Sequence, residues 1–412
     1  MARDYRRVGE DDRVVGHVQR HRVVTLDALR GVGALLVLVS HVGFWSGASR
    51  DGVLGALAAR GDSGVAVFFA ISAYLLGRPA LARALADDPP PARVARYARH
   101  RAVRILPAYL LVLAAVVLAA LVIGGRAADP VSVRTVLVHL VVGQGLVGPT
   151  FQSFTQTWSL TTEVCFYLLL PLAAGALGVL LRRLPGAARG RAVLCGVLVL
   201  ALVGLAVQAL AASAPGAGWS GPLATSVVGH AAWFAVGLVA AVVSLDGAAL
   251  PARWGALRET VATSPGTLVL TAGLVLLVAC TPLAGPRDLA APSPAEAVVK
   301  ELLYAVLAAL LLAAALARGA DERVQRSPAA GAARWAGDLS YGVFLWHVLV
   351  LQVLFATLSL PLFAVPAGWL LVAVLVISLG LAALTWVGVE RPALRRLRQE
   401  PVGSPAGAAA PR

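Results

Sequence analysis

Asparagine is absent from this chain of 412 residues, and its single lysine is Lys300. Charged residues are also scarce, at 14%, whereas hydrophobic residues make up 59% of the chain and the mean hydropathy is +0.80. Such a composition excludes an ordinary soluble globular protein, whatever the number of domains that the length would allow. It is typical of a membrane protein that crosses the lipid bilayer many times.

Cysteine is equally rare, and the three cysteines, Cys165, Cys195 and Cys280, each lie inside an apolar run. That placement argues against a disulfide framework and against a thiolate metal site. The sequence also has no HExxH pair, no glycine-rich loop between a strand and a helix, and no GxSxG turn. We therefore expect no metal ion and no resident cofactor.

Positive charge is in excess, with 35 Lys and Arg against 21 Asp and Glu. The basic residues do not interleave with aromatic residues as in a nucleic-acid interface, so we expect no nucleic-acid partner. They lie between apolar runs, as the positive-inside rule requires of cytoplasmic loops. The sequence therefore predicts a multi-pass protein of the cell (plasma) membrane with both termini in the cytoplasm. The strongly basic segments are 78–104, 182–191, 318–338 and 391–398.

The predicted fold is all-α, a polytopic membrane helix bundle of about ten transmembrane helices. A short apolar segment at 136–149 is interrupted by polar residues and glycines, and we expect it to be an external re-entrant or interfacial segment. The predicted domain organisation is a disordered cytoplasmic tail over 1–24, a membrane domain over 25–395 and a second disordered tail over 396–412. The expected spans are 25–45, 63–79, 105–123, 158–181, 192–213, 223–245, 265–284, 297–317, 339–359 and 367–388.

The first expected span carries Asp27 and Arg30 near its start and His41 near its end. Eleven residues of α-helix return to within roughly 20° of the same face and rise by about 16 Å. Arg30 and His41 therefore share one stripe of the helix. An arginine at that depth can extend to the surface and a histidine can bond a neighbouring helix, but ionisable groups within a membrane often mark a functional path.

Further polar residues lie at the ends of other spans. Arg101 and Arg104 share one helical face and could bind a polyphosphate, or anionic lipid headgroups. Glu163 requires a partner, which could be His41, His139 or an arginine. Paired with His41, Glu163 would orient the imidazole. A purely structural ion pair is the alternative.

Small residues and two more histidines complete the candidates. Ser72 is either a hydrogen-bonding site residue or one of several small residues that let a second helix approach. His230 and His347 also lie in spans, and we interpret His230 as structural.

Six motifs, in this order along residues 22–395, resemble those of acyltransferase family 3. Any one of them is weak, but their order on a ten-span protein is specific. One departure is Ala73, where this family usually has glycine, which affects helix packing more than chemistry. The motifs are Arg30 with His41, Phe68-Phe69 with Ser72, Arg101-x-x-Arg104-Ile-x-Pro107-x-Tyr109, Trp158-Ser-Leu-x-x-Glu163-x-x-Phe-Tyr167, Ser340-Tyr341 with Trp346-His347, and Glu390-Arg-Pro392.

The resemblance implies an integral-membrane enzyme that moves an acyl group, most often acetyl, from acyl-coenzyme A to a hydroxyl of a carbohydrate or a glycosylated product. The partners would thus be the acyl-CoA donor, that acceptor and the lipid bilayer. His41 would act as a general base or as a carrier of the acyl group, Glu163 would orient it and Arg30 would contact the donor. The expected substrate-binding residues are Arg101, Arg104, Ser72, Trp158, Tyr341 and His347.

A transporter or flippase for a glycan or a small product is the main alternative. Transporters tend to have broken helices at corresponding positions of two halves. In this chain the polar residues are concentrated in the first four spans, and no later span repeats the stripe of Arg30 and His41. The distribution therefore favours the enzyme.

Overall fold

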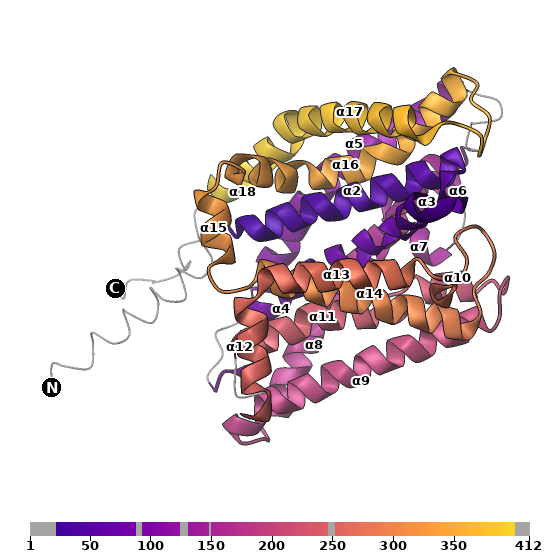
Figure 1. Cartoon of the computed structure of the whole chain (residues 1–412). Coiled ribbons are helices and arrows are strands. Elements are labelled where there is room, and N and C mark those ends of the chain that lie inside the picture. Colours follow the sequence, from indigo (N-terminus) through magenta and orange to yellow (C-terminus); the bar gives the residue numbers. More distant parts are fainter. Residues whose placement is uncertain (1–21, 88–92, 124–130, 148–149, 246–251, 400–412) are drawn as a thin grey trace, which may run out of the picture.

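The structure is a computed structural model that describes residues 22–87, 93–123, 131–147, 150–245 and 252–399 (Figure 1). Within these ranges the regular elements are all helices. Apart from short 3-10 segments, these are α2 (Val24–Ser46), α3 (Gly52–Ala59), α4 (Gly64–Leu85), α5 (Val94–Ile123), α6 (Val133–Leu140), α7 (Gln144–Val147), α8 (Trp158–Leu181), α9 (Gly186–Ala212), α10 (Ser220–Ala224), α11 (Ala231–Leu245), α12 (Gly255–Thr263), α13 (Pro265–Ala279), α14 (Pro294–Ala315), α15 (Ala320–Arg326), α16 (Ala330–Thr357), α17 (Ala367–Thr385), a π-helical turn (Trp386–Glu390) and α18 (Arg391–Gln399).

The long helices confirm the predicted polytopic bundle. Among the described residues, eight stretches are long and apolar enough to cross a membrane, and the pair α12 and α13, bent by 91°, would be a ninth. The shorter apolar helix α11 has 15 residues, and with it each of the ten predicted spans corresponds to one helix. The segment predicted not to cross forms α6 and α7, which are too short to span a bilayer.

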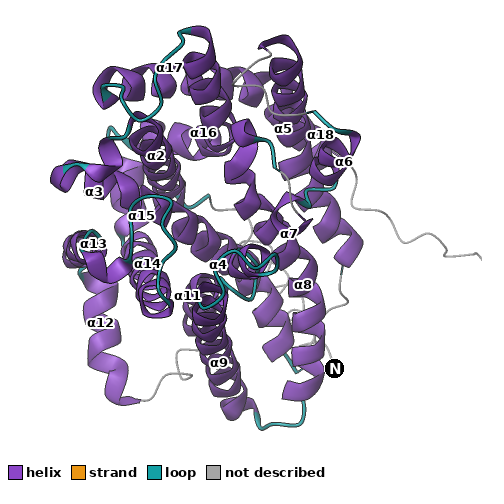
Figure 2. Cartoon of the chain, turned by 90° about the vertical axis from the view of Figure 1, so that its right-hand side faces the viewer, coloured by secondary structure: helices purple, strands orange, loops and turns teal. Residues whose placement is uncertain are grey.

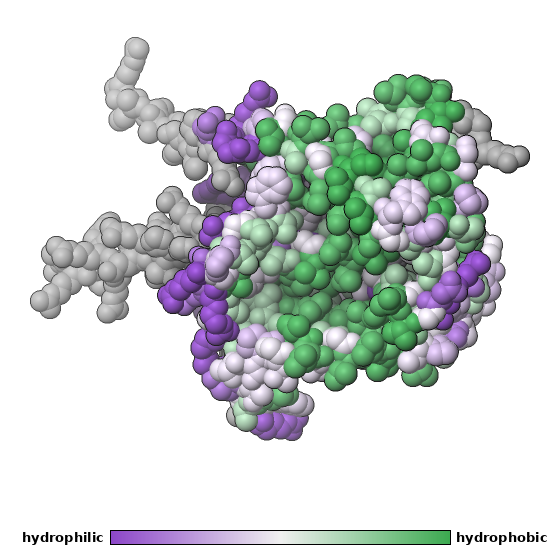
Figure 3. All heavy atoms as spheres, turned by 45° about the horizontal axis from the view of Figure 1, so that its top comes forward, coloured by the Kyte–Doolittle hydropathy of each residue, from purple (hydrophilic) through white to green (hydrophobic). Residues whose placement is uncertain are grey.

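The two ends of the bundle differ in polarity. Helices α12, α15 and α18 lie at one end and α3, α6, α7 and α10 at the other (Figure 1). The space-filling view shows hydrophilic residues gathered at the first end, followed by a broad apolar surface (Figure 3). The basic segments 318–338 and 391–398 lie at the hydrophilic end, as expected for a face toward anionic headgroups.

Helices α2 and α16 run side by side in the bundle (Figure 2). Glycines allow this close approach, because a methyl group added at Gly337 would come within 2.4 Å of Cβ of Asp27. A methyl group at Gly31 would come within 2.6 Å of Cβ of Ala336. Small residues at such contacts are the usual means of packing helices in a membrane.

Helix α4 packs against α11 in the same way, and this contact explains Ala73. A methyl group on Gly237 of α11 would lie 2.1 Å from the carbonyl oxygen of Ala70 and 2.7 Å from Cβ of Ala73. The glycine that lets the backbones approach is therefore on α11, and Ala73 fills the space opposite it, fully buried.

Some residues that we predicted to belong to the two disordered tails are ordered in the structure. Val24 already belongs to α2, and Arg22 donates hydrogen bonds to Asp27 and to Asp338. At the other end α18 continues to Gln399, so residues 396–399 are helical rather than disordered. Residues 1–21 and 400–412, which make up the rest of both predicted tails, lie outside the described residues.

Candidate functional site

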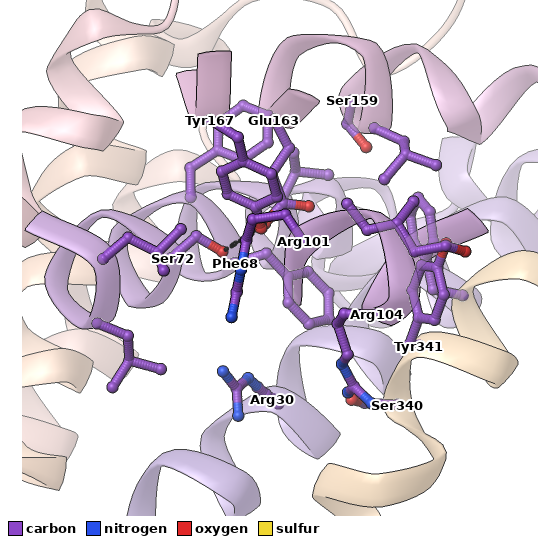
Figure 4. Close-up of a pocket in the computed structure, with 17 residues that line it drawn as sticks. Arg30, Phe68, Ser72, Arg101, Arg104, Ser159, Glu163, Tyr167, Ser340 and Tyr341 are labelled. Carbon is purple, nitrogen blue, oxygen red and sulfur yellow. Dashed lines mark hydrogen bonds between the residues drawn. The ribbon is translucent and has the colours of Figure 1, made fainter. Parts of the chain in front are cut away.

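A cavity lies among α2, α4, α5, α8 and α16, near the end of the bundle where α2 and α5 begin (Figure 4). Its empty space is about 820 Å³, including the open mouth. Apolar and polar side chains line it in nearly equal number, and the polar groups come from all five helices. The polar residues lining it are Arg30, Ser72, Arg101, Arg104, Ser159, Glu163, Tyr167, Ser340 and Tyr341.

Positive charge dominates this cavity. Arg30, Arg101 and Arg104 contribute three guanidinium groups, and Glu163 contributes the one carboxylate among the lining residues. Figure 4 shows Arg30 and Arg101 extending into the same open space from opposite sides. Because like charges repel in a partly buried site, this arrangement favours an anionic ligand with several acceptor oxygens.

The three arginines differ in how they are held. Arg30 lies 3.4 Å from the carboxylate of Asp27, one turn before it in α2. Arg101 lies over the ring of Tyr167, at 5.9 Å from its centroid. Its Nε is buried and has no hydrogen-bond partner among the described residues. Arg101 is therefore the guanidinium whose hydrogen-bonding capacity is most available to a ligand.

Glu163 has different partners from those expected. Its Oε1 accepts hydrogen bonds from the hydroxyl of Ser72 and, at 2.5 Å, from that of Tyr167. We expected Glu163 to pair with His41, with His139 or with an arginine, and in the part of the chain that the structure describes none of these residues forms a hydrogen bond with it. Glu163 therefore does not orient the His41 imidazole in this structure. The two hydroxyls instead satisfy a carboxylate that lies inside the bundle.

Tyr341 connects two helices that line the cavity. Its hydroxyl donates a 3.0 Å hydrogen bond to the carbonyl oxygen of Ile105, which joins α16 to α5. Tyr341 thus sets the distance between Arg104 on α5 and the ring of Phe344 on α16, both of which line the cavity.

His41 and His347 lie together outside the lining of this cavity. Nε2 of His347 is 3.3 Å from Nδ1 of His41, and the two rings meet edge to face. The expectation that Arg30 and His41 look into one shared cavity is therefore wrong for His41. Phe344 lies between the two places, since its ring lines the cavity and also packs against His347, with centroids 6.2 Å apart.

Trp158 is also absent from the lining. Its ring packs against His230, with centroids 5.3 Å apart, and the next residue, Ser159, faces the cavity instead. His230 is buried, stacks on Trp233 and lies 3.1 Å from Glu301. These contacts agree with a structural role for His230.

Several residues of the site were not predicted from the sequence: Ser159, Ser340 and Tyr167 in the lining, and Glu390 beside it. Tyr167 follows Glu163 by four residues, a spacing that places both on one helical face, so the signal was present. Glu390 lies at the end of the π-helical turn, is 2% exposed and pairs with Arg104. A carboxylate within the closing motif was visible in the sequence, but its partner on α5 was not.

No group of three or more His, Cys, Asp or Glu side chains that could hold a metal ion occurs among the described residues. The chemistry available at the site thus consists of guanidinium groups, hydroxyls, one carboxylate and a nearby pair of imidazoles.

Comparison with known proteins decides the family. The model of acyltransferase family 3, described as an acyltransferase domain, matches residues 23–387. The chain belongs to this family. It is 27% identical over 404 residues to Nodulation protein 10 of Rhizobium leguminosarum bv. viciae, covering 92% of this chain and 95% of that protein. No solved structure matches it.

Membership of acyltransferase family 3 selects between the two classes that the sequence left open. The chain is a multi-pass membrane acyltransferase, and the alternative of a transporter or flippase has no support from these comparisons. The family does not by itself name the donor, the acyl group or the acceptor.

Proposed function

We propose that this acyltransferase uses acyl-CoA, with acetyl as the transferred group, and acylates a hydroxyl of a carbohydrate or glycosylated acceptor. The observation that supports the donor is the cavity with three guanidiniums and one carboxylate, in which the buried Nε of Arg101 has no hydrogen-bond partner among the described residues. Coenzyme A carries several phosphates, and planar guanidinium forks bind phosphate oxygens in pairs.

The donor would enter at the end of the bundle where α2 and α5 begin. That end carries the basic segments, which the positive-inside rule assigns to the cytoplasm. We therefore propose that both termini are cytoplasmic and that the enzyme resides in the plasma membrane. The phosphates would contact Arg30, Arg101 and Arg104, and the thioester arm would extend along α2 toward His41.

The transfer itself balances in one step if His41 is the general base. The acceptor oxygen attacks the thioester carbon, His41 takes the hydroxyl proton, the C–S bond breaks and the thiolate leaves and takes up a proton. In the carrier variant, Nε2 of His41 attacks the thioester carbon, the C–S bond breaks and the thiolate leaves. The acceptor oxygen then attacks the acyl-imidazole, the C–N bond breaks, the thiolate takes up the hydroxyl proton and His41 is released. Both routes need an unprotonated ring nitrogen on His41.

The donor site is tested by comparing Arg101→Ala with Arg183→Ala, which removes an exposed arginine from a basic loop. A hydrogen bond to a charged group contributes about 1.5–3 kcal/mol, so we expect Arg101→Ala to raise the KM for acetyl-CoA about 10- to 100-fold. The Arg183→Ala variant should keep the wild-type KM. Purified protein in lipid nanodiscs is incubated with labelled acetyl-CoA and a panel of sugars, and the release of free CoA is measured.

Acceptor-dependent CoA release by the wild type supports the enzyme and identifies the acceptor class. Binding of acetyl-CoA without turnover over the whole panel would contradict the proposed acceptor class. An equal KM in the Arg101→Ala and wild-type proteins would remove the donor site from this cavity. Mass spectrometry of surface glycans from a deletion strain, looking for a lost acyl increment, tests the acceptor independently.

A further inference from the structure

His41 of α2, which is half-buried, and His347 of α16, which is buried, form a pair with a defined direction. The ring centroids of His41 and His347 are 4.9 Å apart and the planes are inclined by 69°. Nε2 of His347 points to Nδ1 of His41 at 3.3 Å. His347 is 1% exposed, and the close packing of α2 on α16 holds the two rings in register.

Backbone carbonyls determine which nitrogen of each ring carries hydrogen. Nδ1 of His347 lies 3.0 Å from the carbonyl oxygen of Val343, and Nδ1 of His41 lies 2.9 Å from that of Val37. A carbonyl oxygen only accepts, so in both rings Nδ1 must be the donor. A neutral imidazole has one N–H, and Nε2 of each ring therefore carries a lone pair.

It follows that Nδ1–H of His41 has two acceptors, the carbonyl of Val37 and the lone pair of His347 Nε2. With its hydrogen held there, His41 presents Nε2 as its unprotonated nitrogen. No described residue hydrogen-bonds Nε2 of His41, and the side chain is only half-buried. This is the nitrogen that either a general base or an acyl carrier needs.

We propose that His347 is a positioning residue that, together with the carbonyl of Val37, holds His41 in the Nδ1–H tautomer and thereby leaves Nε2 as the reactive nitrogen. This inference rests on the proposed function of His41. His347 takes the place that sequence reasoning gave to Glu163, which bonds Ser72 and Tyr167 instead. An acceptor at Nδ1–H also stabilises the positive charge that His41 gains when Nε2 takes a proton or an acyl group.

His347 performs this role as a neutral group. When His41 becomes positive, a second cation 3.3 Å away would repel it strongly inside the bundle, so His347 keeps its lone pair directed at His41. Its contact with Nδ1–H of His41 favours the same tautomer as the carbonyl of Val37.

The experiment compares His347→Phe with His347→Gln in nanodiscs. Phenylalanine keeps an aromatic ring but has no acceptor, so we expect kcat to fall about 10- to 100-fold with an unchanged KM for acetyl-CoA. The amide oxygen of glutamine can accept from Nδ1–H, so His347→Gln should recover most of the lost kcat. Trp346→Phe is the matched control on α16, because it removes an N–H that bonds Thr385, not His41.

A second measurement does not depend on the stability of any His347 variant. Nitrogen NMR of wild-type protein labelled with ¹⁵N-histidine, in bilayers at neutral pH, should show a protonated Nδ1 and an unprotonated Nε2 for His41. The His41 signals are those missing from the His41→Ala protein.

Three outcomes would overturn the proposal: wild-type kcat in His347→Phe, no recovery in His347→Gln, or a protonated Nε2 on His41 in the wild type. If wild-type protein releases no CoA with any acceptor, the proposed function fails instead, and the tautomer of His41 is still decided by NMR.

Discussion

Arg104 and Glu390 are 286 residues apart in the chain and form an ion pair, with Nη1 of the arginine 3.3 Å from Oε2 of the glutamate. Glu390 is 2% exposed and ends the π-helical turn that follows α17. Such turns are rare and often occur at functional sites. Here the turn directs a carboxylate at an arginine of the cavity, while the ring of Trp386 lies 6.0 Å from the same guanidinium.

This pair predicts that Glu390→Gln will weaken donor binding. Without the carboxylate, Arg104 loses the group that orients its guanidinium toward the cavity, and a buried charge pair is broken. We expect the KM for acetyl-CoA to rise about 10-fold with little change in kcat. Steady-state kinetics in nanodiscs measures both constants.

Glu259→Gln is the matched control for that experiment. Glu259 also pairs with an arginine, Arg318, but both side chains are more than half exposed. Exposed pairs contribute about 0–1 kcal/mol, so this variant should behave as the wild type. A KM in Glu390→Gln equal to that of Glu259→Gln would show that Glu390 does not act through Arg104.

The contact between α2 and α16 predicts a second effect, on stability. Gly337→Ala would place a methyl group 2.4 Å from Cβ of Asp27, so the helices must separate or the helix backbone must shift. Overpacking of this kind costs about 1–3 kcal/mol. We expect a lower Tm, measured by tryptophan fluorescence of the purified protein, and a lower kcat, because Arg30 and the histidine pair sit on the same two helices.

Gly331→Ala on the same helix serves as the comparison. No atom lies within 4 Å of a methyl group built there, so it should leave the Tm unchanged or raise it slightly, since alanine is the better helix former. Equal Tm values for the two variants would mean that α2 and α16 are not in close contact at Gly337.

The polytopic helical fold and the positions of most long helices could be predicted from the sequence. Hydrophobic runs of fixed length identify spans in a bilayer, and polar residues within them stand out against a background with so little charge. Arg30, Ser72, Arg101, Arg104 and Glu163 do line one cavity. Each of these residues stands out within its own helix, which is the kind of information that a sequence carries.

Contacts between helices could not be predicted in this way. The sequence places His41 and Glu163 at similar depths, but depth does not determine how each helix is rotated about its axis. The rotations found here turn Glu163 toward Ser72 and Tyr167, and His41 toward His347. Ridge-and-groove packing around small residues such as Gly337 sets these rotations, and it depends on the whole bundle.

The separation of Glu163 from the histidine pair predicts how their variants combine. Residues that share no contact have additive effects, within about 0.3–0.5 kcal/mol, whereas residues in one hydrogen-bond network do not. We expect the losses in kcat/KM from Glu163→Gln and His347→Phe to multiply, to within about twofold, in the double variant.

Glu163→Gln combined with Tyr167→Phe is the coupled reference, because each change removes part of the same hydrogen bond. The loss in kcat/KM of this double variant should be smaller than the product of the losses in the two single variants. If Glu163 oriented His41, as the sequence suggested, Glu163→Gln and His347→Phe would act on one tautomer, and their double variant would show the same shortfall. If kcat/KM of the Glu163→Gln, His347→Phe double variant is close to that of the worse single variant, Glu163 acts together with His41. If the two losses in kcat/KM multiply, Glu163 acts only in the wall of the cavity.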